Sequence, residues 1–268
     1  MPIDFARRLT GRQRSAAADR QLGFGLAFVA GAINAGGFLA VQQYTSHMTG
    51  IVSSMADNLA LGVFGPVWVG VGALLSFLAG AATSAVMVNM ARHRQLNSIY
   101  AFPLLLEAFL LLCFGVMGAW LASVHGLFVP VTVMLLCFIM GLQNAVITKL
   151  SGAVIRTTHI TGVVTDIGIE LGKLLYRSAS PGPAERQPKG RATHLGTLTR
   201  LALSFFVGGV VGALGFNQLG YISTVPLALV LVALAGVPAV DDLRALRLER
   251  RDRRRARHAR RAAAKGNP

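Results

Sequence analysis

The chain has 268 residues, of which 53% are hydrophobic and only 14% are charged. In soluble globular domains about a quarter of the residues are charged, so this composition argues against a soluble protein. The formal net charge of +15 is unevenly distributed, because the Arg-rich last 28 residues hold 11 of the 26 Lys and Arg residues. A basic segment on so apolar a chain is first explained by a membrane. The two cysteines, Cys113 and Cys137, lie in apolar runs, so we expect no disulfide framework and no metal site.

Six apolar segments are long enough for membrane-spanning helices, since about 20 helical residues cross a hydrocarbon core of roughly 30 Å. The sequence therefore predicts an all-α integral membrane protein. The first segment follows several arginines, as a signal peptide does, but it is long for a signal core and we expect it to be retained. The predicted spans are Leu22–Val41, Val67–Met90, Ile99–Ser123, Leu127–Ile147, Leu198–Phe216 and Leu219–Val240.

The segments between these spans alternate in charge. Lys and Arg occur before the first span, between the second and third, between the fourth and fifth, and after the sixth, whereas the other loops contain none. The positive-inside rule then places both termini in the cytoplasm. We expect a cytoplasmic basic N-terminus (residues 1–21) and a cytoplasmic Arg-rich tail (residues 241–268).

The tail is rich in Arg, Ala and Leu between Leu243 and Lys265, a composition that favours a helix. Beside a membrane we expect it to attract anionic lipid, at about 1 kcal/mol for each basic residue near the surface. We do not expect nucleic-acid binding, because no aromatic residues are interleaved with the basic ones.

The two halves of the chain resemble each other. Three blocks align: "FVAGAINAGGF" (Phe28–Phe38) with "FIMGLQNAVIT" (Phe138–Thr148), "YTSHMTGIVS" (Tyr44–Ser53) with "RTTHITGVVT" (Arg156–Thr165), and "SFLAGAATSA" (Ser76–Ala85) with "SFFVGGVVGA" (Ser204–Ala213). Because each half holds three spans, the second half would enter the membrane upside down. We therefore predict two inverted three-helix repeats, residues 22–123 and 124–240, the second with a cytoplasmic loop at 176–197. Many secondary transporters use such repeats.

The third pair of aligned blocks also contains small residues four apart. Gly80 and Ser84 form such a pair in the first half, and Gly208 and Gly212 form one in the second. Small residues at this spacing let two helices approach closely in a membrane, so we expect them at helix contacts.

A polar motif follows the first span of each repeat, as "SHMTG" (Ser46–Gly50) and as "THITG" (Thr158–Gly162). Thr49 and Thr161 can serve as N-caps of a new helix. The 10–12 residues that follow each motif are too few to span, so we expect a half-helix or an interfacial helix in each repeat. The N-terminus of a half-helix suits an anionic group or a polarised solute.

Other residues of the two motifs add chemistry or flexibility. Gly50 and Gly162 let the backbone turn or approach a neighbour closely. His47 and His159 add one titratable imidazole to each copy, and Asp166 follows the second motif. Two interpretations stay open: a device that caps and packs helices, or a site that handles a solute or a proton.

Three polar residues within the predicted spans are candidates for a functional role. Asn34 and Asn144 occupy matching positions, where an amide needs a partner, and they either contact a solute or bond between helices. Glu107 has no acidic counterpart in the sixth span. An intramembrane carboxyl is a functional hypothesis by default, so Glu107 either loads and releases a proton or bonds to a neighbouring helix.

The two motif blocks resemble the YoaK family of bacterial membrane proteins, a domain of unknown function. The resemblance is carried by "AGAINAGGFLAV…YTSHMTGIVSSMADNLALG" and "GLQNAVITKLSGAVIRTTHITGVVTDIGIELG", and it covers about residues 22 to 240. It implies a six-span, multi-pass protein of the bacterial inner membrane and supplies no established activity. Asn34 stands where the family often has Asp, and Ile51 where it often has Asn, so the first copy is less polar than the family pattern.

The sequence favours a small-solute secondary transporter, with proton coupling as one option. A passive channel, or a membrane scaffold or sensor that transports nothing, is the alternative. We expect no enzyme, because no HExxH, GxSxG or paired-acid motif occurs, and no cofactor. The identity of the solute and the presence of a homo-oligomer stay open. The candidates for the solute path are Asn34, His47, Thr49, Gly50, Asn144, His159, Thr161, Gly162 and Asp166, with Glu107 as the candidate for proton linkage.

Overall fold

The structure is a computed structural model, and it describes residues 16–96, 98–121, 125–150, 160–179, 191–236 and 239–244. This part of the chain is helical and contains no strand, which confirms the predicted all-α class. Residues 224–236 and 239–244 continue as helix after the last element. The elements are α2 (Ala16–Val41), α3 (Met48–Ala60), α4 (Phe64–His93), α5 (Ala101–Leu121), α6 (His125–Leu150), α7 (Ile160–Ala179), α8 (Arg191–Leu219) and the 3₁₀ turn η1 (Gly220–Ser223).

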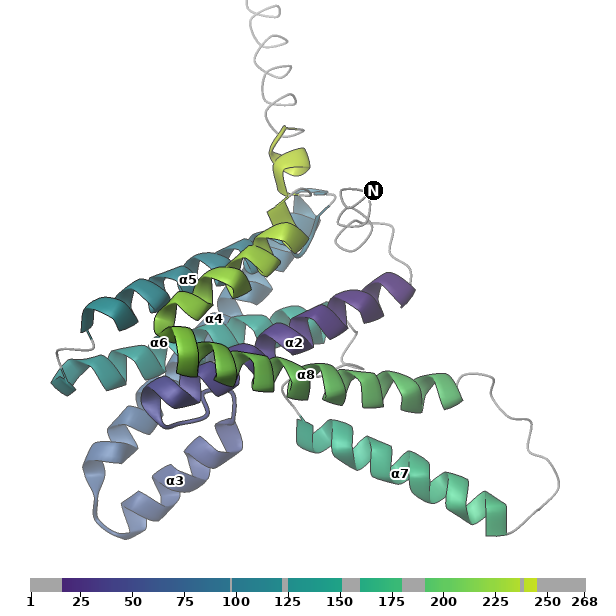
Figure 1. Ribbon diagram of the computed structural model, residues 1–268, viewed down its shortest axis with the longest axis horizontal. Helices are drawn as coiled ribbons and strands as arrows, with labels where there is room; N and C mark the ends of the chain where they lie inside the picture. The colour runs from purple at the N-terminus through teal and green to yellow at the C-terminus, as the bar shows by residue number, and fades with distance from the viewer. Residues whose placement is uncertain are drawn as a thin grey trace, which may run out of the picture.

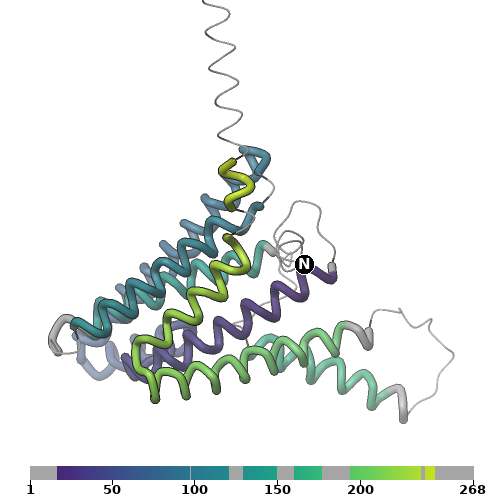
Figure 2. Tube along the Cα trace, turned by 45° about the horizontal axis from the view of Figure 1, so that its top comes forward, coloured from purple at the N-terminus to yellow at the C-terminus, as the bar shows by residue number. Residues whose placement is uncertain are grey.

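Within the described residues, five stretches are long and apolar enough to cross a membrane. They are Ala17–Val41, Phe64–His93, Ala101–Trp120, Val129–Lys149 and His194–Gly236. The last stretch contains α8, η1 and the helical residues 224–236. At η1, where Gly220 adopts a φ of +61°, the chain turns back and runs beside α5 (Figures 1 and 2).

The helices α2 and α8 form one closely packed pair and run side by side in the same direction (Figures 1 and 2). A β-carbon on Gly31 of α2 would collide with the carbonyl oxygen of Phe205 in α8. Reciprocally, a β-carbon on Gly208 of α8 would collide with the carbonyl oxygen of Phe28 in α2. Only glycine lets the two backbones approach this closely.

The helices α4 and α6 form a second pair, and their crossing has the same construction. A β-carbon on Gly80 of α4 would collide with the carbonyl oxygen of Phe138, and one on Gly141 of α6 would collide with that of Phe77. In all four helices the glycine follows its phenylalanine by three residues. The small-residue faces predicted from the sequence therefore do lie at helix contacts.

The two pairs meet through α2 and α6, where the core is apolar except for a few amides. The amide nitrogen Nε2 of Gln143 in α6 donates a hydrogen bond to the carbonyl oxygen of Leu26 in α2, at 3.3 Å. Both helices also contribute fully buried side chains to the core, among them Leu22, Ile33 and Leu136. The contact between the pairs is thus an apolar core with isolated polar contacts.

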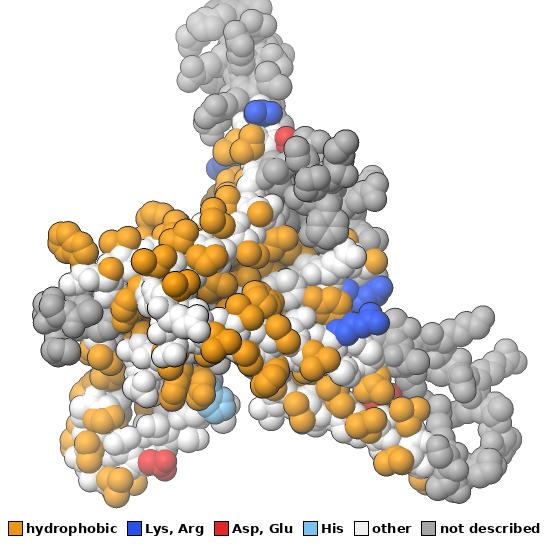
Figure 3. Space-filling view, viewed as in Figure 1, with side chains coloured by type: hydrophobic (Ala, Val, Ile, Leu, Met, Phe, Trp, Pro, Cys, Tyr) orange, Lys and Arg blue, Asp and Glu red, His pale blue; other side chains and the backbone are white. Residues whose placement is uncertain are grey.

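Large apolar side chains cover much of the outer surface (Figure 3). Trp68 is 71% exposed, Trp120 is 84% exposed and Phe206 is 67% exposed. A soluble monomer rarely exposes so much contiguous apolar surface, whereas a lipid-facing helix requires it. The outer surface therefore fits a multi-pass membrane protein.

The helices α3 and α7 project from the bundle at its lower left and lower right (Figure 1). After the motif, α3 ends at Ala60, within the 10–12 residues that we expected to follow Gly50, whereas α7 continues to Ala179 and is longer than expected. The expected loop at 176–197 is also too long, because α7 continues to Ala179 and α8 already begins at Arg191. The apolar residues of α7, such as Leu171 and Leu174, are spaced along a helical face, and this amphipathic pattern extends the helix.

Candidate functional site

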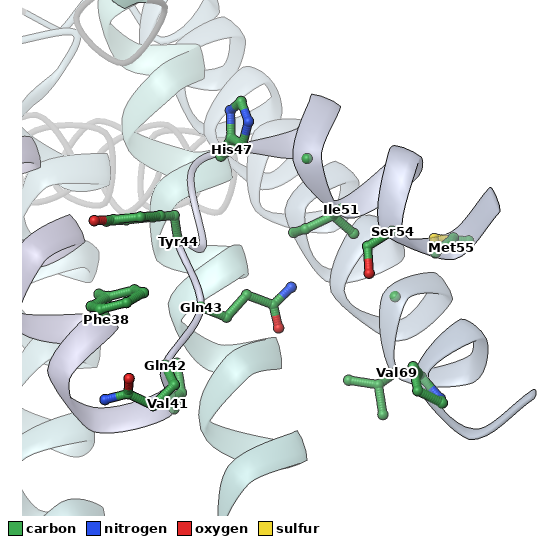
Figure 4. Close-up of a pocket in the computed structure, with 13 residues that line it drawn as sticks. Phe38, Val41, Gln42, Gln43, Tyr44, His47, Ile51, Ser54, Met55 and Val69 are labelled. Carbon is green, nitrogen blue, oxygen red and sulfur yellow. The ribbon is translucent and has the colours of Figure 1, made fainter. Parts of the chain in front are cut away.

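A cavity of about 610 Å³ lies between the end of α2, the helix α3 and the start of α4 (Figure 4). The segment that links α2 to α3 forms one wall, and the first turns of α4 form the opposite one. Its polar lining side chains are Gln42, Gln43, Tyr44, His47 and Ser54. Its apolar lining side chains are Phe38, Val41, Ile51, Met55, Pro66 and Val69, and Gly50 and Gly70 complete it.

The wall formed by residues 42–47 depends on a tight turn at the end of α2. Gln42 adopts a φ of +54°, and its N–H donates a hydrogen bond to the carbonyl oxygen of Phe38 at 2.7 Å. The turn brings the ring of Tyr44 onto that of Phe38, with centroids 4.4 Å apart and the rings stacked. Positive φ is uncommon for residues other than glycine, so the turn and the aromatic stack together define the shape of this wall.

Two glycines of the cavity make room for larger side chains. The imidazole of His47 packs over Gly50, where a β-carbon would collide with it. The side chain of Met55 in α3 packs over Gly70 in α4 in the same way. The close approach that we predicted for Gly50 is thus present, and the group that approaches it is the side chain of His47 from the same motif.

The expected cap of α3 was wrong. The helix begins at Met48, so His47 is the N-cap residue and Thr49 lies in the first turn. The imidazole makes no capping hydrogen bond. Histidine packs on Gly50 instead, and the threonine side chain of the motif is exposed.

Asn34 is joined to the first motif by a hydrogen bond. The hydroxyl of Ser46 donates to Asn34 Oδ1 at 2.8 Å, in a partly buried position. Neither residue lines the cavity, but Ser46 directly precedes His47, which does. The bond therefore holds the start of the motif against the last part of α2.

The candidate residues of the second copy are not gathered at this cavity. Thr161, Gly162 and Asp166 are exposed on α7, and a β-carbon on Gly162 would meet no neighbour within 4 Å. His159 lies outside the described residues. The cavity is therefore built from the first copy of the motif.

Asn144 also does not meet Asn34. It is 9% exposed, and its Nδ2 donates to the carbonyl oxygen of Met140 in the same helix at 2.8 Å. The neighbouring Gln143 contacts Leu26, which precedes Asn34 by eight residues, about 12 Å along a helix axis. The side chains of Asn34 and Asn144 thus lie in separate parts of the bundle and form different hydrogen bonds.

Glu107 is fully buried in α5, and no described residue forms a hydrogen bond with either of its carboxyl oxygens. No residue of α5 lines the cavity. Among the described residues, no group of three or more His, Cys, Asp or Glu side chains is placed to hold a metal ion. Glu107 therefore does not touch the cavity, and it could influence a solute there only indirectly, through the packing of the helices.

Sequence reasoning missed several polar residues of the cavity. Gln42, Gln43 and Tyr44 form a polar triplet directly after an apolar span, and this signal was available in the sequence. Ser54 and Met55 gave no signal of their own, because they line the cavity only once α3 has folded back on α4.

Comparisons with known proteins agree with the membrane fold. Residues 22–237 match the family model described as "Protein of unknown function (DUF1275)". The chain is also 27% identical over 154 residues to the "UPF0700 transmembrane protein YoaK" of Bacillus subtilis (strain 168), a match that covers 57% of this chain and 67% of that protein. No solved structure matches this chain. Since the family model covers most of the chain, including the cavity, the chain belongs to the DUF1275 family and is a multi-pass membrane protein of the YoaK type.

Proposed function

We propose that this protein is a small-solute secondary transporter of the bacterial inner membrane, built from two inverted three-helix repeats. The observation that carries the proposal is the pair of equivalent helix crossings, α2 with α8 and α4 with α6. Each crossing joins one helix of the first repeat to one helix of the second.

The equivalence of the crossings extends to individual contacts. The contact of Gly31 with Phe205 becomes the contact of Gly141 with Phe77 when each residue is replaced by its aligned partner in the other half. Two copies related by a twofold axis would produce this exchange. Transporters with inverted repeats bind their solute at the interface between the copies.

Six spans follow if the stretch His194–Gly236 crosses the membrane twice. At 43 residues it is about twice the length that one helical crossing needs, and the reversal at η1 divides it. Both termini then lie on the cytoplasmic side, in agreement with the distribution of Lys and Arg.

The transport mechanism that we propose moves one helix pair against the other. Within each pair, glycine contacts hold the two backbones together, so each pair is expected to move as a unit. Between the pairs, the contact rests on apolar packing and on bonds such as that from Gln143 to Leu26. The cavity beside α3 lies at the end of α2 that precedes a segment without Lys or Arg, and in this topology that segment is on the outer face.

Glu107 is the residue that we propose for proton linkage, because it is an acid buried within a span and has no hydrogen-bond partner among the described residues. Buried acids of this kind mark proton relays in transporters. The basic tail is proposed to bind anionic lipid, and no enzymatic activity or cofactor is proposed.

The topology has a direct test in single cysteines at positions 47 and 159, in a background with Cys113 and Cys137 replaced by alanine. An impermeant maleimide should label His47→Cys from the outside of intact cells and His159→Cys only after permeabilisation. Labelling of both from the same side would exclude the inverted repeat.

Transport itself requires a solute screen by thermal shift on the full chain in detergent. Solutes that stabilise the protein are then tested for flux into proteoliposomes, with and without a pH gradient. Flux that responds only to the solute gradient would indicate the passive channel, and absence of flux for every stabilising solute would favour the scaffold or sensor.

A further inference from the structure

We propose that the cavity beside α3 binds uncharged solutes that combine an apolar part with hydrogen-bonding groups, and that it excludes ions. This inference rests on the proposed transport function, because it names the class of solute that would enter the transporter at this cavity on its outer face. Its evidence is the chemistry of the lining and how the lining is arranged.

Among the described residues, the cavity is lined by no carboxylate, ammonium or guanidinium group, and its ionisable side chains are those of His47 and Tyr44. None of the described residues that line the cavity is Lys, Arg, Asp or Glu. Asp57 of α3 is exposed and does not line it. A charged solute would have to give up hydration water without gaining a carboxylate, ammonium or guanidinium partner, which makes its entry unfavourable.

The polar groups of the lining suit a neutral solute. In Figure 4 the side chain of Gln43 extends across the cavity toward Ile51 and Ser54. A glutamine amide can donate and accept, and a serine hydroxyl can do both. Ser54 Oγ already accepts a bond from Asn58 Nδ2 at 3.3 Å, which orients its hydroxyl proton toward another acceptor. A carbonyl, amide or hydroxyl group on the solute could therefore bond to Gln43 on one side and to Ser54 of α3 on the other.

The remaining surface of the cavity is apolar. Ile51 is 3% exposed and belongs to the buried core, Met55 packs on Gly70 of α4, and Val69 adds a further apolar side chain to the lining. The stacked rings of Phe38 and Tyr44 form a flat face on the other side. A mostly apolar cavity with a few convergent polar groups is the usual form of a small-molecule site.

The second half of the chain carries a charge at the position that aligns with a cavity residue. Ser54 aligns with Asp166, so the aligned position carries a carboxylate in one copy and a hydroxyl in the copy that forms the cavity. The exposed Asp166 on α7 is not part of the lining. Replacing Ser54 by Asp would thus introduce, in the cavity, the charge that the second copy already has at this place.

The experiment uses solutes that share size and shape and differ in charge. Benzamide, benzamidinium and benzoate form one such set, and butyramide, butylammonium and butyrate form another. Binding of each to the full chain in detergent is measured by isothermal titration calorimetry and by thermal shift. We expect at least one amide to bind at least tenfold more tightly than both of its charged counterparts.

Two variants connect this binding to the cavity. Val69→Trp should fill the space and weaken amide binding at least tenfold, whereas Leu78→Trp, on the exposed side of the same helix, should leave it unchanged. Ser54→Asp should weaken amide binding and strengthen binding of the ammonium or amidinium counterpart. Because the expected result for Ser54→Asp is a gain in binding of the cation, this variant tests the inference even if Val69→Trp does not fold.

The outcomes separate this inference from the transport proposal. Charged counterparts that bind as tightly as the amides, with a loss in Val69→Trp, would overturn the inference, and so would failure of both amides to bind. Amide binding without flux in proteoliposomes would support the inference and contradict transport. Cavity-dependent flux of an ion would contradict the inference and leave transport standing.

Discussion

Gly31 of α2 lies against the carbonyl oxygen of Phe205 in α8, with no room for a β-carbon between them. The aligned residue of the other half, Gly141, has the same relationship with Phe77. These contacts fix where α2 crosses α8 and where α6 crosses α4. Helix association in a membrane relies on such close packing, because lipid provides little hydrophobic driving force between apolar helices.

Replacing either glycine by alanine should therefore destabilise the protein by a similar amount. In Gly31→Ala and Gly141→Ala the added methyl group would push the helix backbones apart, at a cost of about 1–3 kcal/mol. Both variants should lower the unfolding temperature measured in detergent. Gly168→Ala is the control, because a β-carbon there meets nothing within 4 Å and alanine favours a helix. An unchanged unfolding temperature in both test variants would contradict the packing argument.

The bond between Ser46 and Asn34 should stabilise the segment that forms the cavity wall. Ser46→Ala removes the donor at 2.8 Å and should cost about 1 kcal/mol. The double variant with Asn34→Ala should cost less than the sum of the two single changes, because the two residues share one interaction. Urea or thermal unfolding of the four proteins measures this coupling. Strictly additive effects would show that the bond contributes nothing to stability.

Much of the fold could be predicted from the sequence, since apolar runs determine the membrane helices and small residues four apart determine close contacts. The sequence could not say which helices pair, because a glycine such as Gly80 fits many partners equally well. It also misplaced the start of α3. Thr49 has the side chain of a capping residue, but the N-cap is His47, two residues earlier, and its imidazole packs on Gly50.

The cavity was beyond prediction for a related reason. Its shape depends on the positive φ of Gln42, a residue with no particular preference for that conformation. It depends equally on Met55 reaching Gly70 across the contact of α3 with α4. Gln42 carries no residue preference that marks this turn, and Met55 meets Gly70 only when α3 packs on α4, so local sequence patterns indicate neither feature.

Asp242 should hold the C-terminal helical segment against the loop between α4 and α5. Its Oδ2 accepts a hydrogen bond from the backbone N–H of Ser98 at 2.8 Å, and both residues are buried. Asp242→Ala leaves this N–H without its charged acceptor and should cost about 1.5–3 kcal/mol. Asp242→Asn keeps an acceptor oxygen and should cost less. Thermal unfolding compares them, and equal losses would mean that packing, and not the bond, accounts for the effect.

Glu107→Gln tests whether the buried acid handles a proton. A carboxyl and a carboxamide have nearly the same shape, so the packing of α5 should be retained and the unfolding temperature should change little. If proton linkage passes through Glu107, the variant should lose the stimulation of solute flux by a pH gradient in proteoliposomes while still binding the solute. Asp57→Asn, which changes an exposed acid of α3, is the matched control and should retain the stimulation. Full gradient-dependent flux in Glu107→Gln would exclude the proton role and leave Glu107 as a structural residue of the bundle.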